Sequence, residues 1–177
     1  MPKFKDYPEF TPNLTPKQIF LLGSFIDQGG YWRNIYSSVL KKNLVDQHKE
    51  FNFLKDVPEH LLVNPDKNYK KYNKYKVKAG SSLEDWEDKG WINKQDPYGW
   101  VQWYCRFYNG RRTEDDERQI KRWKNLAGPN GRFRNALINK IKEKKAKFND
   151  ESISPVIRQT LQQWGYKLTQ KDFNLKY

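Results

Sequence analysis

The stretch DPYGWVQWYCRFY, residues 96–108, carries the strongest structural signal in this chain of 177 residues. Its four large aromatic residues recur at i, i+3, i+4 and i+7, which places them on one face of an α-helix: Trp100, Trp103, Tyr104 and Phe107. Asp96-Pro97 is a typical helix start, and Asn109-Gly110 is a typical helix end. We therefore expect a helix here whose aromatic face is buried in the core.

Similar signals place further helices on both sides of this one. Each start combines a capping residue with a following proline, acidic residue or apolar period. From residue 80 onward we expect five helices, which begin near Ser81 with Glu84, Asp96-Pro97, Thr113, Arg132 and Ser154-Pro155. In the fourth of these, Phe133, Ala136, Leu137 and Ile141 are expected to point inward, and Val156 in the fifth. The sequence thus predicts a mainly α fold, a compact helical bundle of about five helices.

The remainder of the chain is less regular. Residues 1–14 hold three prolines and predict an extended N-terminal arm, followed by one helical domain over 15–177 that starts at Thr15-Pro16. Residues 31–39 could form a short strand or a loop. Residues 66–79 mix lysine, tyrosine and asparagine at low complexity, so a mobile loop is expected there.

Composition limits the classes of function. No apolar run reaches the about 18 residues of a transmembrane helix, and residues 1–10 lack the apolar region of a secretory signal. A single cysteine, Cys105, excludes an intrachain disulfide, and the two histidines lie outside any ligand-spaced cluster. We therefore expect an intracellular protein of the cytoplasm or nucleus, without metal, cofactor or membrane.

The formal net charge of +13 is combined with an aromatic content of 16%. The aromatic residues supply enough apolar area for a packed core, so the charge is expected on the surface of a folded domain. Between residues 118 and 147 eleven basic side chains face only Glu143: Arg118, Lys121, Arg122, Lys124, Arg132, Arg134, Lys140, Lys142, Lys144, Lys145 and Lys147. An imbalance of this size favours contact with phosphates.

Other side chains could add to such a surface. Four residues of the aromatic helix lie off its aromatic face, and their chemistry suits stacking on or hydrogen bonding to an unpaired base: Tyr98, Gln102, Arg106 and Tyr108. Arg111 and Arg112 precede an expected helix start and could grip a phosphate, although the acidic residues 114–117 could instead pair with them. The predicted nucleic-acid contacts are Tyr98, Gln102, Arg106, Tyr108, Arg111, Arg112, Arg118, Arg122, Lys124, Arg132, Arg134 and Lys140.

Asp115 and Asp116 allow a catalytic alternative. A carboxylate near aromatics and arginines could act as a general acid or base, and Asp116 shares a side with Ile120 and Trp123 and should be the more buried. Adjacent helical residues point about 100° apart, so the two carboxylates cannot easily share one proton or metal. A purely structural role, with arginine partners, is the competing interpretation.

From Ser81 to Trp164 the pattern resembles a family of uncharacterised proteins found in bacteria and eukaryotes. The resemblance rests on GWI at 90–92, on DPYGWVQWYCRFY followed by GRR at 110–112, on DD, RQI and RW between 115 and 123, and on RQTL and QW between 158 and 164. It marks residues 80–165 as a family-like core. No activity is established for that family, so the resemblance implies membership without chemistry.

These observations favour a nucleic-acid-binding protein, with DNA favoured over RNA. Two alternatives stay open. The first is an enzyme that acts on a nucleic acid or nucleotide, for example in base excision or modification, with Asp116 or Asp115 as acid-base. The second is a structural or assembly protein that docks on an acidic partner or oligomerises, with exposed aromatic residues as anchors.

Overall fold

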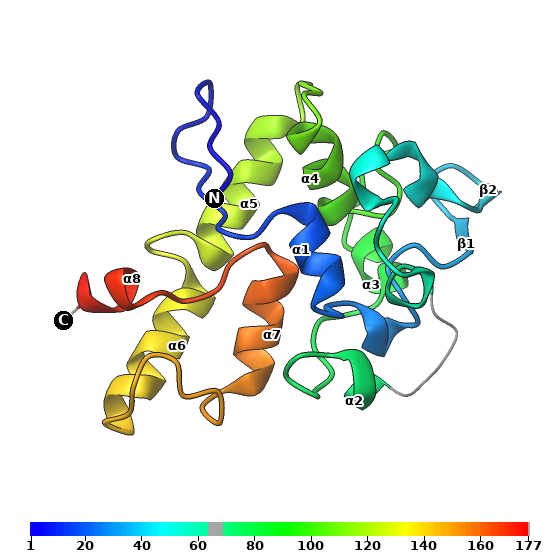
Figure 1. The fold of residues 1–177 in the computed structure, drawn as a ribbon. Coiled ribbons are helices and arrows are strands. Elements are labelled where there is room, and N and C mark those ends of the chain that lie inside the picture. Colours follow the sequence, from blue (N-terminus) through cyan, green and yellow to red (C-terminus); the bar gives the residue numbers. More distant parts are fainter. Residues whose placement is uncertain (64–68, 177) are drawn as a thin grey trace.

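The computed structural model describes residues 1–63 and 69–176, and within these residues the fold is mainly helical (Figure 1). The α-helices are α1 (Pro16–Leu21), α2 (Tyr69–Tyr72), α3 (Leu83–Asp88), α4 (Trp100–Tyr108), α5 (Asp116–Ala127), α6 (Arg132–Glu143), α7 (Pro155–Gln163) and α8 (Gln170–Asn174). Single turns of 3₁₀ helix occur at Ile26–Gln28, Gln47–Glu50, Asn52–Leu54 and Glu59–Leu61.

The longer helices gather in one half of the molecule. Helix α6 contacts both α5 and α7, and α4 contacts α5 and α1. Figure 1 shows α6 and α7 next to each other, while α5 runs from α4 toward the start of α6. The mainly helical fold agrees with the prediction, although the connections after α4 and before α3 are long and irregular.

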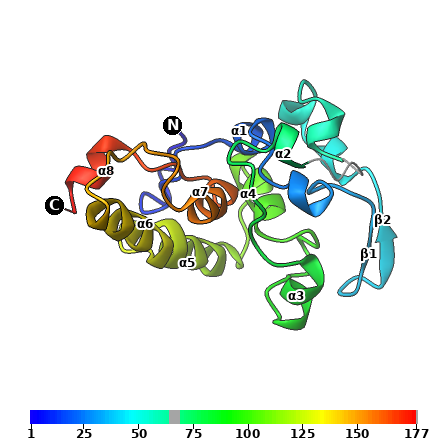
Figure 2. The ribbon, with the colours of Figure 1, turned by 90° about the horizontal axis from the view of Figure 1, so that it is seen from below.

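The other half is built from turns and one short hairpin. Strand β1 (Ile35–Ser37) pairs antiparallel with β2 (Lys42–Leu44), so that Ile35 faces Leu44. Residues 31–39, for which the sequence allowed either a strand or a loop, thus contain the short strand β1. It lies far from α6 and α8 in both ribbon views (Figures 1 and 2).

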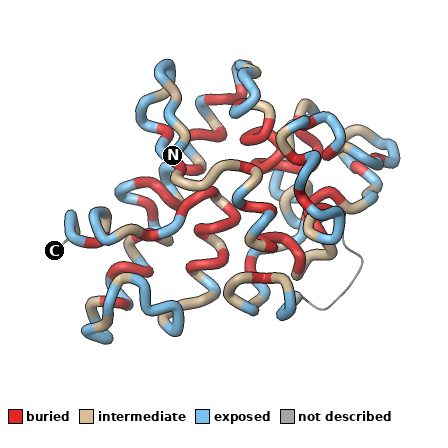
Figure 3. Tube along the Cα trace, viewed as in Figure 1, coloured by how far each residue is buried: buried red, intermediate tan, exposed pale blue. Residues whose placement is uncertain are grey.

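Aromatic side chains fill the core between the two halves. The expected aromatic face of α4 is buried, with Trp100 5% exposed and Trp103, Tyr104 and Phe107 0% exposed. From α5, Ile120 and Trp123 join the same cluster. The buried segments meet in the middle of the molecule (Figure 3).

Residues 1–14 hold no helix or strand, yet they are packed onto the core. Phe10 is 1% exposed, and its ring lies 5.3 Å from that of Trp123 and 5.5 Å from that of Trp103. Phe4 packs edge-on against Phe107 at 4.9 Å. The segment therefore completes the core next to α4 and α5.

Several helix starts differ by a few residues from the prediction. Helix α3 is capped by Ser82 and Asp85 in place of Ser81 and Glu84, because the sequence SSLED offers the same capping box in two registers. Helix α4 begins only at Trp100, since Gly99 adopts φ 99° and a Cβ there would lie 3.1 Å from Ile92. By contrast, Thr15 is the N-cap of α1 and Pro16 its first residue, as expected, and Gln18 completes a capping box.

The inward faces of α6 and α7 differ at single positions. Leu137 and Ile141 are buried as expected, whereas Ala136 is exposed and Ile138 is buried instead. Val156 in α7 is 49% exposed. In α6 the buried face is rotated by only part of a turn from the predicted one, because Leu137 and Ile141 belong to both faces.

The lysine-tyrosine segment lies partly outside the described residues, which resume at residue 69. Its described part contains α2 and the buried Asn73, whose side chain accepts hydrogen bonds from the backbone N–H groups of Tyr75 and Lys76. In the described parts of the chain, no helix is both long and apolar enough to cross a bilayer.

Candidate functional site

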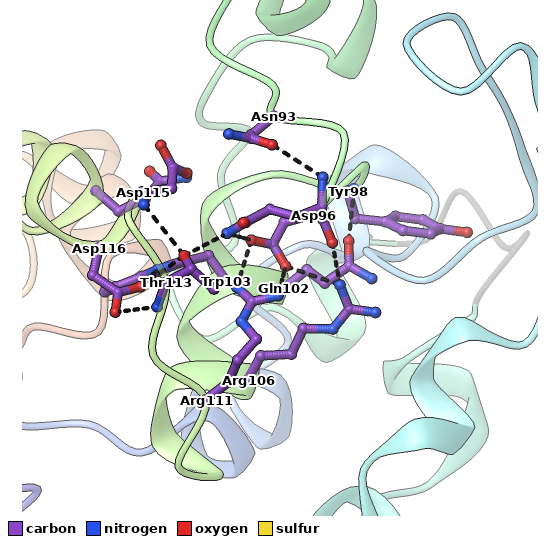
Figure 4. Close-up of polar contacts among 12 residues, drawn as sticks. Asn93, Asp96, Tyr98, Gln102, Trp103, Arg106, Arg111, Thr113, Asp115 and Asp116 are labelled. Atoms are coloured by element: carbon purple, nitrogen blue, oxygen red, sulfur yellow. Dashed lines mark hydrogen bonds and ion pairs between the residues drawn. The ribbon is translucent and has the colours of Figure 1, made fainter.

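A group of charged side chains surrounds Asp96, just before α4. We call it the polar cluster: Glu50, Gln95, Asp96, Arg106 and Arg111, of which Figure 4 labels Asp96 and the two arginines. Asp96 is 1% exposed and accepts both guanidinium hydrogen bonds of Arg111, at 2.8 and 2.6 Å, and one of Arg106, at 3.0 Å. The rest of the Arg106 guanidinium binds Glu50 at 2.7 and 2.9 Å, which lowers the pKa of Glu50. Arg106 and Arg111 are thus neutralised by the protein itself.

Both candidate catalytic carboxylates have structural partners. Asp116 is 1% exposed and accepts hydrogen bonds from Trp103 Nε1 at 2.9 Å and from the backbone N–H of Thr113 at 2.8 Å (Figure 4). Asp115 is 7% exposed and forms a two-pronged ion pair with Arg118 at 2.6 and 3.0 Å. Asp116 is the more buried, as expected. Its contacts join the start of α5 to the middle of α4, a structural arrangement.

Tyr98 and Gln102 do not point away from the core, contrary to the expectation from helical spacing. They are 2% and 0% exposed. Gln102 accepts a hydrogen bond from the backbone N–H of Tyr98 at 2.9 Å, and Tyr31 donates its hydroxyl to the carbonyl of Tyr98 at 2.6 Å. The irregular half of the molecule packs against this side of α4. These contacts come from distant residues, so the sequence around α4 does not predict them. Tyr108 is 39% exposed and packs edge-on against Phe53.

Two more predicted contacts, Arg112 and Arg134, also have internal partners. Arg112 binds Asp6 at 2.7 Å and lies 3.6 Å above the ring of Phe107. Arg134 is 5% exposed, donates to the carbonyl of Ala127 at 2.8 Å and stacks on Tyr166 at 4.0 Å. The expectation of an outward-facing cation at Arg134 is therefore wrong.

The basic residues that stay exposed follow α5 and α6, and we call them the basic face: Lys121, Lys124, Arg132, Lys140, Lys144, Lys145 and Lys147. On α6, residues 132, 136, 140 and 144 recur every four positions and share one side of the helix. Only Lys140 forms a salt bridge among the described residues of this set, a surface pair with Glu143 at 3.4 Å. Such exposed pairs are worth about 0–1 kcal/mol.

Beside the basic face lies a half-open pocket of about 430 Å³, which we call the aromatic pocket. Its described walls come from α3, α4, α5, α6, α7 and the loop after α3. The rings in the lining are Phe25, Tyr31, Trp86, Trp91, Trp100, Phe133 and Trp164, and its two charged side chains are Arg122 and Arg132. No carboxylate lines it within the described chain. The volume falls within the range of about 300–1,000 Å³ that is usual for small-molecule sites.

The local structure around Gly90 positions the mouth of the pocket. Gly90 adopts φ 70° after α3, and the N–H of Trp91 donates back to the carbonyl of Trp86 at 3.0 Å. This turn places Trp91 at the rim, 36% exposed. Trp86 donates its indole N–H to Ser81 at 3.0 Å, while Trp100 stacks on Trp164 at 4.7 Å between ring centroids.

Arg122 is a half-buried charge in the lining of this pocket. Its guanidinium lies 5.5 Å from the ring centroid of Trp91 and 5.3 Å from that of Trp164, and it donates to Gln119 at 2.9 Å. Within the described residues it has no salt bridge. Burial, together with the neighbouring Arg118, lowers the pKa of Arg122 from 12.5 to about 10, so the side chain is still charged at pH 7. A bound anion would compensate this charge.

Trp100 adds an unsatisfied donor to the same region. It is 5% exposed, and its indole N–H has no hydrogen-bond acceptor among the described residues. An unpaired buried donor costs about 1–3 kcal/mol and is uncommon in folded proteins. Trp100 itself belongs to the lining of the pocket.

Of the predicted contacts, the structure places Arg122 and Arg132 in the lining of the pocket, and Lys124 and Lys140 are exposed on the same two helices. Sequence reasoning missed the roles of Trp86, Trp91 and Trp164. Trp164 is far from the other two in the chain, so no local sequence pattern indicates that the three residues share a pocket. Only Trp91 follows a helix-ending glycine directly, a position at which an exposed aromatic residue could be expected.

In the described residues no group of three or more His, Cys, Asp or Glu side chains could hold a metal ion. Comparisons of the chain with protein-family models, with characterised proteins and with solved structures gave no match. Membership of the bacterial and eukaryotic family that residues 80–165 resemble therefore stays a prediction.

Proposed function

We propose that this protein binds nucleic acid along the basic face. The observation that carries the proposal is the uneven distribution of ion pairs: arginines near α4 are paired with carboxylates, whereas six of the seven basic-face residues have no salt bridge among the described residues. Exposed cations without carboxylate partners attract phosphates and release the counterions of the nucleic acid.

Several of the predicted contact residues are left out of the proposed surface, because they are already paired within the protein. Arg106, Arg111, Arg112, Arg118 and Arg134 already have internal partners, and each would have to give one up to reach a phosphate. Lys124, Arg132 and Lys140 stay as the contacts of the proposal, joined by Lys121, Lys144, Lys145 and Lys147. The proposed complex is non-enzymatic, because Asp115 and Asp116 are occupied by structural partners.

The test compares two triple variants with equal net charge. Lys124→Glu, Arg132→Glu and Lys140→Glu together reverse the basic face. Lys3→Glu, Lys42→Glu and Lys55→Glu reverse three exposed lysines elsewhere. Fluorescence anisotropy with labelled duplex DNA, single-stranded DNA and RNA is measured over a range of salt concentrations.

We expect the basic-face variant to lose roughly tenfold or more in affinity, with a salt dependence shallower by about three phosphates. The control variant should lose much less. Equal losses in both variants would mean that only net charge matters, and no binding of wild-type protein at low salt would overturn the proposal. Capture of a protein partner after nuclease treatment would then favour an assembly role.

A further inference from the structure

We propose that the aromatic pocket receives one unpaired nucleobase together with its phosphate, so that nucleic acid on the basic face is single-stranded or locally unpaired at this point. The inference rests on the proposed function and adds the class of ligand. Three features of the pocket carry it: its rings, its charge and its position.

The rings suit a flat heteroaromatic ligand. The rings of Trp91, at the rim, and of Trp164 both lie near the Arg122 guanidinium, which is 5.5 and 5.3 Å from their centroids. Phe133 and Trp86 add further rings to the lining. Every nucleobase has a flat face that can stack on an aromatic side chain, so this contact does not depend on the nucleotide sequence.

The positive charge of the pocket lining favours an anionic ligand. The pocket holds Arg122 and Arg132 and, among the described residues, no aspartate or glutamate. A cage for a cation such as a methylated lysine would combine aromatic rings with carboxylates, and the two guanidinium groups repel such a ligand. A base with an attached phosphate supplies both a flat ring and the missing negative charge, and two arginines can bind the phosphate oxygens.

The position joins the pocket to the basic face. Helix α5 contributes Arg122 and Asn125 to the lining, and α6 contributes Arg132 and Phe133. The same two helices carry most of the basic face, to which Arg132 also belongs. A strand whose backbone follows the basic face can therefore place one base into the pocket without leaving the phosphate contacts.

The first experiment uses small probes and the full chain. Isothermal titration calorimetry measures binding of adenosine monophosphate, adenosine and inorganic phosphate. We expect adenosine monophosphate to bind most tightly, because it alone presents both the ring and the phosphate. Trp91→Ala should weaken it roughly tenfold, while Tyr108→Ala, an equally exposed aromatic residue outside the pocket lining, should not.

The second experiment separates the pocket from the basic face. Two DNA duplexes differ by a single bulged base, and their affinities are compared for wild type, Arg122→Gln and Lys121→Gln. These variants remove the same charge from neighbouring positions of α5, of which only Arg122 lines the pocket. We expect Arg122→Gln to abolish the preference for the bulged duplex, and Lys121→Gln to weaken both duplexes equally while the preference persists.

Each result decides one of the two proposals. If wild type binds both duplexes equally and the monophosphate no better than phosphate, the pocket proposal is wrong and the basic face alone binds. If neither duplex binds, the proposed function fails; tight binding of the free monophosphate would then identify a mononucleotide site. Two controls test whether Arg122→Gln disturbs packing. Thermal unfolding is measured for each variant, and the charge-preserving variant Arg122→Lys is included in the binding measurements. Arg122→Lys should keep phosphate binding and part of the preference.

Discussion

The polar cluster and the basic face both contain cations, yet their charges are organised in opposite ways. In the polar cluster a carboxylate that is 1% exposed is shared by two arginines, and Glu50 completes the set. On the basic face the only salt bridge among the described residues is the surface pair of Lys140 and Glu143. Positive charge near α4 is therefore paired within the fold, whereas six of the seven basic-face cations have no carboxylate partner among the described residues.

This contrast shows that the net charge of a segment says little about which cations can bind. Arg118 and Arg134 lie inside the basic segment of the sequence, but Asp115 holds the first and Ala127 with Tyr166 the second. Removal of a carboxylate that pairs with an arginine should therefore lower stability and leave binding unchanged. Removal of a basic-face lysine should weaken binding and leave stability unchanged.

The largest effect is expected from Asp96→Asn. The change leaves Arg111 without its partner and Arg106 with Glu50 alone, inside a region where these arginine side chains are 26% and 19% exposed. Breaking a buried pair from one side typically costs about 3–5 kcal/mol of folding free energy. Urea unfolding measures the loss, and Asp88→Asn, the same change at an exposed position of α3, is the control. Similar midpoints for both variants would show that the polar cluster does not hold the fold together.

Asp116→Asn should have a smaller effect of about 1–3 kcal/mol. The asparagine can still accept from Trp103, but its amide cannot accept from the Thr113 N–H that Asp116 now binds at 2.8 Å. Affinity for nucleic acid should be unchanged, because the residue is 1% exposed. If the stable variant instead lost a measured turnover on a nucleic acid or nucleotide, Asp116 would be catalytic and the structural assignment wrong.

The smallest effect on stability is expected from Lys144→Gln on the basic face. This lysine is exposed and has no salt bridge among the described residues, so the free energy of unfolding should change by less than about 0.5 kcal/mol. The logarithmic slope of affinity against salt should fall by about one, as for one lost phosphate contact. An unchanged slope would remove Lys144 from the proposed surface.

The sequence predicts the helices well wherever the signal is local. The spacing of aromatic residues locates α4 and its buried face, and Thr15-Pro16 locates the start of α1. The start of α3 is ambiguous because SSLED holds two overlapping capping boxes. Local patterns thus define which elements form, and they leave their ends uncertain by a few residues.

The site could be predicted only in part, because its decisive contacts are distant in sequence. Arg106 meets Glu50 across 56 residues and Arg112 meets Asp6 across 106, so their pairing is invisible to a local pattern. The same holds for Trp86 and Trp164, which come together only in the folded pocket. Arg122 and Arg132 could be named from their charge, but not their shared pocket.

The packing of the first residues has a consequence for how the chain folds. Phe10 rests on Trp103 and Trp123, and Asn13 hydrogen-bonds to Lys167 across 154 residues. On the ribosome these early side chains emerge long before their partners, and they have no core to enter until α5 and the segment after α7 have been made. Such distant contacts delay folding relative to an ordinary helical bundle. Phe10 therefore has no complete packing site until Trp123 of α5 has been synthesised.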